Sequence, residues 1–176
     1  MTRLRTLWRD RRATALIEFA IVLPVLLILF AGGYQLSDAI TCKRKVTIMN
    51  RAIGDLTSQY RTLRATELDG LMTAATQIMA PYSTDPIIVR VTQITVDDKA
   101  ETYRIDWSRA HNTYATPPSK YPIEYLPPAY RRPNMVFIKT QTYYRYDTIL
   151  PDYLDSMIFS DVIWLLPRRS ATITLT

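Results

Sequence analysis

The stretch FAIVLPVLLILFAGGY, residues 19–34, decides the fold and contains no charged side chain. Residues 13–17 extend it backwards past a single acid, Glu18. At about 1.5 Å per helical residue, the shorter and the extended stretches span roughly 24 Å and 33 Å, whereas the hydrocarbon core of a bilayer is about 30 Å thick. The sequence therefore predicts one membrane-spanning helix over residues 14–36.

The charges around this helix predict its orientation. The preceding residues include five arginines, Arg3, Arg5, Arg9, Arg11 and Arg12. Under the positive-inside rule, this basic N-terminus lies in the cytoplasm and residues 37–176 lie outside. A cleaved secretory signal peptide is the alternative, with Ala31, Gly32 and Gly33 as small residues near a cleavage site. The length of the apolar stretch and the acid inside it are unusual for a signal peptide.

Composition excludes several classes of protein. The 176 residues fit one ordinary domain beside the membrane segment. The net charge of +6 comes mostly from the N-terminal arginines. No nucleic-acid-binding motif accompanies the later basic cluster of Lys43, Arg44, Lys45 and Arg51, so we expect no nucleic-acid partner. Cys42 is the only cysteine, which excludes an intrachain disulfide framework and a cysteine metal cluster.

Glu18 is the most informative single residue of the apolar stretch. A carboxylate at membrane depth costs a few kcal/mol and normally marks a site with a partner. No Lys or Arg lies between Glu18 and Lys43, so a compensating cation would come from another chain or from a newly made N-terminus. The alternative is that Glu18 lies at the headgroup level and is simply solvated.

The stretch from Ala13 to Pro24, ATALIEFAIVLP, resembles the start of the TadE-like pseudopilins of tight-adherence pili, a branch of the type IV pilus systems. In that family a basic leader ends in a small residue, usually Gly, followed by four residues, Glu, an aromatic residue and an apolar run with an early Pro. The resemblance implies that a prepilin peptidase cuts between Ala13 and Thr14. Glu18 and Phe19 then become the fifth and sixth residues of the mature chain. Ala13 departs from the usual Gly, so an uncut, anchored form stays open.

The same resemblance implies roles for two residues of the span. Glu18 would attract the free amine of a neighbouring processed subunit. Pro24 lacks a backbone donor and is expected to loosen or kink the helix. Weaker features of the family follow later in the chain, at Trp107-Ser108, Tyr143-Tyr144-Arg145-Tyr146 and Pro167-Arg168.

Apolar residues continue after the span at steps of three and four, which predicts that the helix extends outward to Leu63. The stripe consists of Ala39, Cys42, Val46, Met49, Ile53, Leu56, Tyr60 and Leu63. We expect it to pack on the protein's own sheet, with an intermolecular coiled coil as the alternative. Cys42 reads as a buried apolar residue, and Gly54 as a weak point that costs up to about 1 kcal/mol relative to Ala.

A second helix and a sheet are expected next. Thr66 and Asp69 resemble a capping pair, and apolar residues at helical spacing, with methionines as core filler, continue until Pro81. The clearest hairpin pairs 87–96 with 102–107 across the turn 97–99. Residues 135–146 and 171–175 read as a third and a possible fourth strand. The expected fold is therefore α+β and pilin-like: a long helix, a short helix and a small antiparallel sheet.

Residues 116–133 form a Pro-rich loop with six prolines. Tyr121, Tyr125 and Tyr130 alternate with these prolines, and Arg131 and Arg132 follow. The loop is either a recognition loop or a stiff cover over a sheet edge. Residues 158–166 are apolar but too few to cross a membrane.

No pattern predicts catalysis, a metal site or a cofactor. His111 is the only histidine and has no nucleophile beside it, while Asp97 and Asp98 read as turn residues. The resemblance implies a minor pseudopilin of the inner membrane, not an enzyme, whose partners are the prepilin peptidase, other pilins or pseudopilins and the assembly platform. The alternative is a permanently anchored periplasmic scaffold or adaptor that binds an envelope protein through its Pro- and Tyr-rich loop.

Overall fold

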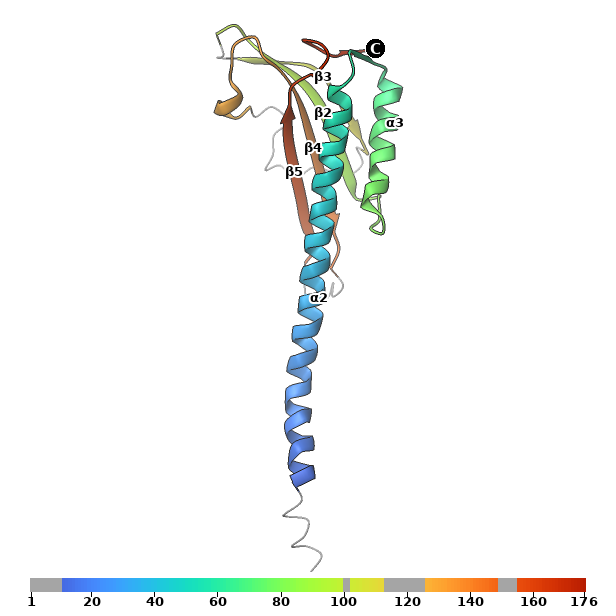
Figure 1. Ribbon diagram of the computed structural model, residues 1–176, viewed down its shortest axis with the longest axis vertical. Helices are drawn as coiled ribbons and strands as arrows, with labels where there is room; N and C mark the ends of the chain where they lie inside the picture. The colour runs from blue at the N-terminus through green and yellow to red at the C-terminus, as the bar shows by residue number, and fades with distance from the viewer. Residues whose placement is uncertain (1–10, 100–101, 113–125, 149–154) are drawn as a thin grey trace, which may run out of the picture. The chain divides into compact units, whose positions relative to one another are not determined.

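The computed structural model describes residues 11–99, 102–112, 126–148 and 155–176, without the side chains of residues 11–13 and 129. The chain divides into two compact units, Met1–Ile40 and Thr41–Thr176. Helix α2 spans Arg11–Ser58, so it enters both. The expected α+β fold is confirmed (Figure 1). The other elements are β1 Thr62–Leu63, α3 Ala65–Thr76, η1 Gln77–Met79, β2 Ile87–Val96, β3 Tyr103–His111, η2 Pro128–Tyr130, β4 Val136–Tyr146, β5 Met157–Leu165 and β6 Thr174–Leu175.

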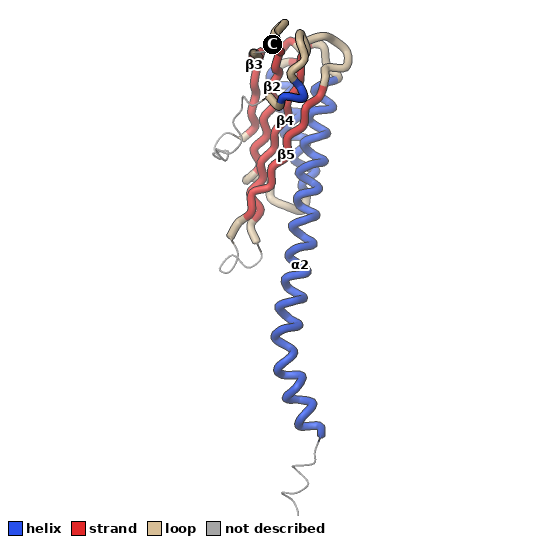
Figure 2. Tube along the Cα trace, turned by 90° about the vertical axis from the view of Figure 1, so that its left-hand side faces the viewer, coloured by secondary structure: helices blue, strands red, loops and turns tan. Residues whose placement is uncertain are grey.

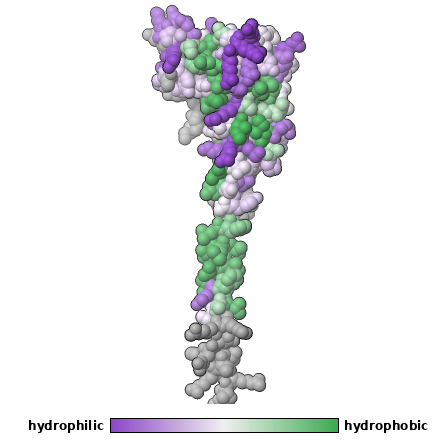
Figure 3. Space-filling model, viewed as in Figure 1, coloured by the Kyte–Doolittle hydropathy of each residue, from purple (hydrophilic) through white to green (hydrophobic). Residues whose placement is uncertain are grey.

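The first unit contains the apolar part of α2. Every side chain from Thr14 to Tyr34 is exposed, and Figure 3 shows this part of α2 as a band of hydrophobic residues. Among the described residues, α2 is the one helix long and apolar enough to cross a membrane. An apolar face normally has to be buried against something. An N-terminal helix with no buried side chain in this stretch is therefore consistent with membrane anchoring.

In the second unit, α2 packs against its own sheet (Figure 2). Four stripe residues are fully buried there: Cys42, Val46, Met49 and Ile53. The expectation of packing on the protein's own sheet is thus confirmed for these residues, and Cys42 is buried as predicted.

The predicted extension of the helix to Leu63 is wrong. Helix α2 ends at Ser58, and Leu63 belongs to β1. Leu56 and Tyr60 remain 41% and 39% exposed. Leu63 fits the apolar spacing of the stripe but is buried as part of β1, so the spacing does not mark a longer helix.

Four strands form an antiparallel sheet in the order β3-β2-β4-β5. The predicted hairpin and third strand are confirmed, although β3 runs on to His111 and leaves Trp107 in its middle. A register shift between Gln93 and Ile94 marks a bulge opposite β3. Within this sheet, the buried side chains lie on the long central strands β2 and β4.

The fourth strand of the sheet was predicted at the wrong residues. Residues 171–175 do not join this sheet; β6, within them, pairs in parallel with β1 as Thr62↔Thr174 and Leu63↔Leu175. The true fourth strand is β5, which pairs with β4 from Tyr146↔Met157 to Ile138↔Leu165. Its apolar residues occupy both faces of the sheet, so the sequence lacks the alternation that identifies a half-buried strand.

The second helix is confirmed, but its predicted cap is wrong. The N-cap is Arg64, whose backbone N–H donates to Glu67 Oε2 at 2.9 Å. Asp69 instead accepts hydrogen bonds from Arg109 of β3 and so ties α3 to the sheet. Met72 and Met79 are fully buried, which agrees with their prediction as core filler.

Gly54 lies where α2 packs closely against the sheet. A Cβ at this position would lie 2.8 Å from Leu165 Cδ1 and 2.9 Å from Thr140 Oγ1. The prediction of a weak point considered helix propensity alone. A side chain here would force Leu165, Thr140 or α2 itself to shift, so glycine favours the close packing of α2 on β4 and β5.

Candidate membrane and assembly segment

The residues predicted to act in processing and assembly lie on the N-terminal part of α2. Thr14, Glu18 and Phe19 are exposed, and Phe19 is 58% exposed. Ala13 is helical in its backbone, while its side chain and residues 1–10 of the leader lie outside the described residues. The predicted cleavage site between Ala13 and Thr14 lies within the first turn of α2, which begins at Arg11.

Glu18 makes no ion pair with any described residue of this chain; the ion pairs among them join other residues. The carboxylate stands on a helix whose neighbouring turns are apolar, from Leu16 to Leu23. A charged group in such a setting needs water, a headgroup or a cation from elsewhere. The geometry therefore leaves Glu18 available to another molecule.

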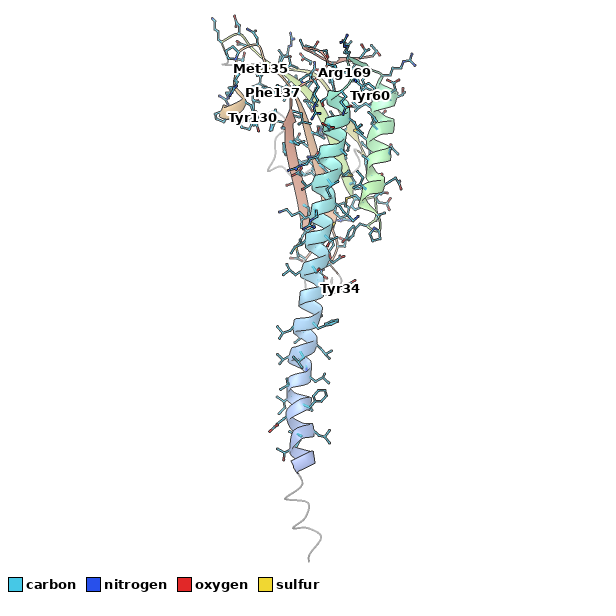
Figure 4. All side chains as sticks on the ribbon, viewed as in Figure 1. Tyr34, Tyr60, Tyr130, Met135, Phe137 and Arg169 are labelled. Atoms are coloured by element: carbon cyan, nitrogen blue, oxygen red, sulfur yellow. The ribbon has the colours of Figure 1, made fainter. Side chains whose placement is uncertain are left out.

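Pro24 lies inside α2, and the helix continues on both sides of it. The missing N–H frees the carbonyl of Ala20 from its usual partner. The bend predicted at Pro24 stays a prediction. Tyr34, labelled in Figure 4, ends the apolar stretch and is 59% exposed, a position that suits an interfacial tyrosine.

A buried polar contact joins α2 to the sheet and was not predicted. Asn50 is fully buried; its Nδ2 donates to Asp161 Oδ2 at 2.8 Å and to the Thr140 carbonyl at 3.3 Å. Its Oδ1 accepts from Thr142 Oγ1 at 3.0 Å. The available signal was Asp161, the single charge in the apolar run 158–166. These bonds satisfy groups that would be costly to bury alone, so they set how α2 lies along β5.

The described end of the Pro-rich loop packs on the domain. Tyr130 stacks on Trp164 at 5.4 Å between ring centroids, and Phe137 meets Tyr130 edge-on at 5.6 Å. Figure 4 shows Tyr130, Met135 and Phe137 gathered together. They line one side of a hollow of about 480 Å³. This part of the loop therefore acts as a cover, whereas Tyr121 and Tyr125 lie outside the described residues.

The candidate catalytic residues occupy structural positions. Asp97 accepts hydrogen bonds from the Thr102 hydroxyl and the Lys99 backbone, and these hold its pKa below the usual range. His111 ends β3 and is half-buried. Within the described part of the chain, no group of three or more His, Cys, Asp or Glu could hold a metal ion.

Lys139 is the one strongly perturbed cation among the described residues. Burial lowers its pKa to about 8, with a further contribution from Arg90. Its Nζ lies 5.1 Å from the centre of the Trp164 ring, where a cation–π interaction stabilises the charged form.

Comparison with known families supports the N-terminal interpretation. Residues 13–47 match the family model of the TadE-like proteins. No curated protein and no solved structure matches the chain. The predicted resemblance is therefore confirmed over the segment that carries Ala13, Glu18 and Pro24. The match does not extend to the sheet.

Proposed function

From the TadE-like segment at residues 13–47, we propose that this chain is a minor pseudopilin that helps to initiate or assemble a tight-adherence pilus. TadE-like proteins are associated with such pili and form a structural, not an enzymatic, family. The chain is held by its N-terminal helix in the bacterial inner membrane, with the basic leader in the cytoplasm and the α+β domain in the periplasm. Its partners are the prepilin peptidase, other pilins or pseudopilins and the assembly platform.

One observation carries this proposal: an exposed apolar helix contains a single acid with no ion-pairing partner in the described chain, five residues after a small residue. Cleavage between Ala13 and Thr14 would create a free amine at the new N-terminus. The Glu18 carboxylate of a neighbouring subunit would attract that amine in a low-dielectric setting. Processing would thus supply a cation for Glu18, which makes no ion pair within the described part of the chain.

The cleavage is tested by expressing the full chain with and without its prepilin peptidase and measuring the intact mass. We expect a product that begins at Thr14 only when the peptidase is present. Ala13→Gly is the matched control and should be cut at least as well, whereas Ala13→Leu should stay uncut because its side chain is too large for a pocket that accepts Gly or Ala. An identical mass under both conditions would remove the processing claim.

The anchored scaffold remains the alternative, and Glu18→Ala separates the two functions. In a pseudopilin, the variant should insert normally but fail to support pilus assembly. In a scaffold, assembly should continue with this variant and stop when residues 116–125 are deleted. The packing of Tyr130 on the domain assigns a structural role to the end of the loop, so the deletion leaves that end in place.

A further inference from the structure

Strand β5 forms one edge of the four-stranded sheet, next to α2 (Figure 2). Among the described residues, no hydrogen bond joins the backbone of β5 to any element other than β4. Alternate residues of an edge strand direct their N–H and C=O groups away from the sheet. Along its second side, β5 therefore offers backbone donors and acceptors to a further strand.

This edge carries less charge than the other edge of the sheet. Strand β3 contains several charged side chains, which oppose pairing with a further strand. Strand β5 contains only Asp161, whose carboxylate is turned toward α2 and accepts a hydrogen bond from the buried Asn50 at 2.8 Å. Val162 is 36% exposed, and Leu166, directly after the strand, is 47% exposed. The open edge is thus mainly apolar.

Two hollows flank the second half of β5 on opposite faces of the sheet. Ile163 and Leu165 face α2, since both lie close to Gly54. With residues of α2 they line a hollow of about 410 Å³, the α2 hollow, formed by Arg51, Ala52, Asp55, Ile163 and Leu165. Trp164 points to the other face and stacks on Tyr130 in the hollow of about 480 Å³ described above, the aromatic hollow. A strand added to β5 would direct alternate side chains toward these two faces.

The charges that line the hollows indicate the chemistry of a partner. Arg51 lines the α2 hollow and Arg132 the aromatic hollow, and neither forms an ion pair with a described residue. Asp55 is the one acid among the described residues that line the hollows, and it is paired with Arg168. The neighbouring turn 97–99 adds two acids and one lysine, and Asp97 is held by hydrogen bonds within that turn. The two unpaired arginines therefore favour an acidic partner.

We propose that β5 accepts an extended acidic segment of another chain as a fifth, antiparallel strand along residues 161–165. Backbone hydrogen bonds supply the affinity, and the hollows select alternate side chains. Acidic side chains on one face of the segment bind Arg51, while apolar side chains on its other face enter the aromatic hollow. Every residue of this site belongs to the unit Thr41–Thr176, so the inference depends neither on the membrane span nor on cleavage.

The test measures binding of a fluorescein-labelled peptide, Glu-Val-Glu-Val-Glu-Val-Glu, to the full chain in detergent micelles by fluorescence anisotropy. Micelles without protein provide the blank. The matched control peptide has the same composition, with its valines in one block. It should bind about tenfold more weakly, because only strict alternation places all the acids on one face and all the valines on the other. Equal binding of the two peptides would contradict the assignment of the hollows.

Substitutions in the chain locate the site. Val162→Glu places a second carboxylate on the edge and should weaken binding about tenfold. Ile158→Glu is the matched control, since Ile158 is 56% exposed on the same face of β5 but lies outside residues 161–165. Arg51→Gln should weaken binding about threefold and reduce its salt dependence, whereas Arg44→Gln, two turns earlier on α2, should change little. Unchanged binding by Val162→Glu would overturn the site.

N-methylated peptides test whether the backbone of the partner is bound. One peptide carries N-methyl groups on its three valines, and a second carries them on three glutamates. One of the two should lose binding and the other should keep it, because only alternate residues of an antiparallel strand bond to a given neighbour. Equal effects of the two would exclude strand addition. If the chain alone sediments as a dimer that Val162→Glu dissociates, the occupant is a second copy and the acidic partner is wrong.

Discussion

Lys139 shows how a single residue can depart from its usual chemistry. It lies in the middle of β4, is 2% exposed and pairs across the strands with Trp164. A lysine side chain is long enough that its ammonium group usually reaches water even when its stem is covered. Here burial lowers the pKa to about 8, so the folded state holds the proton more weakly than the unfolded chain does.

This difference predicts a pH dependence of stability. Between pH 8 and the ordinary lysine pKa of 10.5, the unfolded chain binds more protons at Lys139 than the folded chain. The contribution of Lys139 to the free energy of unfolding should therefore rise with pH through this window. Lys139→Met should reduce that rise in denaturant titrations of the full chain in detergent. Lys99→Met, at an exposed turn, is the control; an equal pH slope in wild type and Lys139→Met would contradict the assignment.

At the scale of elements, the decisive contact is between α2 and the strands β4 and β5. Gly54 allows the close approach, and the buried Asn50 satisfies groups on both strands. Helix propensity predicted only a small penalty at Gly54. The missing information was the position of Leu165, more than a hundred residues later in the sequence.

Gly54→Ala should lower the free energy of unfolding by about 1–3 kcal/mol, because the new methyl group overpacks against Leu165 and Thr140. Gly70→Ala is the matched control in α3. No atom lies within 4 Å of a Cβ at Gly70, so this change should be neutral or stabilising. Chemical denaturation of the full chain compares the two. Equal effects would show that backbone freedom, not packing, decides the cost at Gly54.

Strands show the same division between local pattern and long-range contact. Residues 87–96 alternate β-branched and polar side chains and were correctly predicted as a strand. β5 was missed because its apolar residues fall on both faces, and β6 was misplaced because its partner, β1, is a two-residue strand directly after α2. The Thr66–Asp69 cap is wrong because α3 begins at Ala65, which places Thr66 inside the helix, and Asp69 binds Arg109 of β3 instead.

At the scale of the whole molecule, the proposed membrane anchoring predicts that the apolar stretch of α2 holds the chain in the membrane. Leu27→Arg with Ile28→Arg should abolish resistance to carbonate extraction, since each arginine near the centre of a span costs about 2.5–3.5 kcal/mol on insertion scales. Ile48→Arg is the control; Ile48 is 49% exposed and lies in the second unit. Continued retention of the double variant would show that another part of the chain holds the membrane.

The sequence alone determined the apolar N-terminal helix, the TadE-like segment and the central strands. These features depend on the composition and spacing of neighbouring residues, which do not change with the position of the segment in the fold. The tertiary structure alone decided where α2 stops contributing to the core, which strand completes the sheet and why Gly54 is needed. Each of these depends on atoms that meet from distant positions, such as Asn50 and Asp161, which are separated by 111 residues. A local sequence pattern does not identify the distant residue that a side chain will contact.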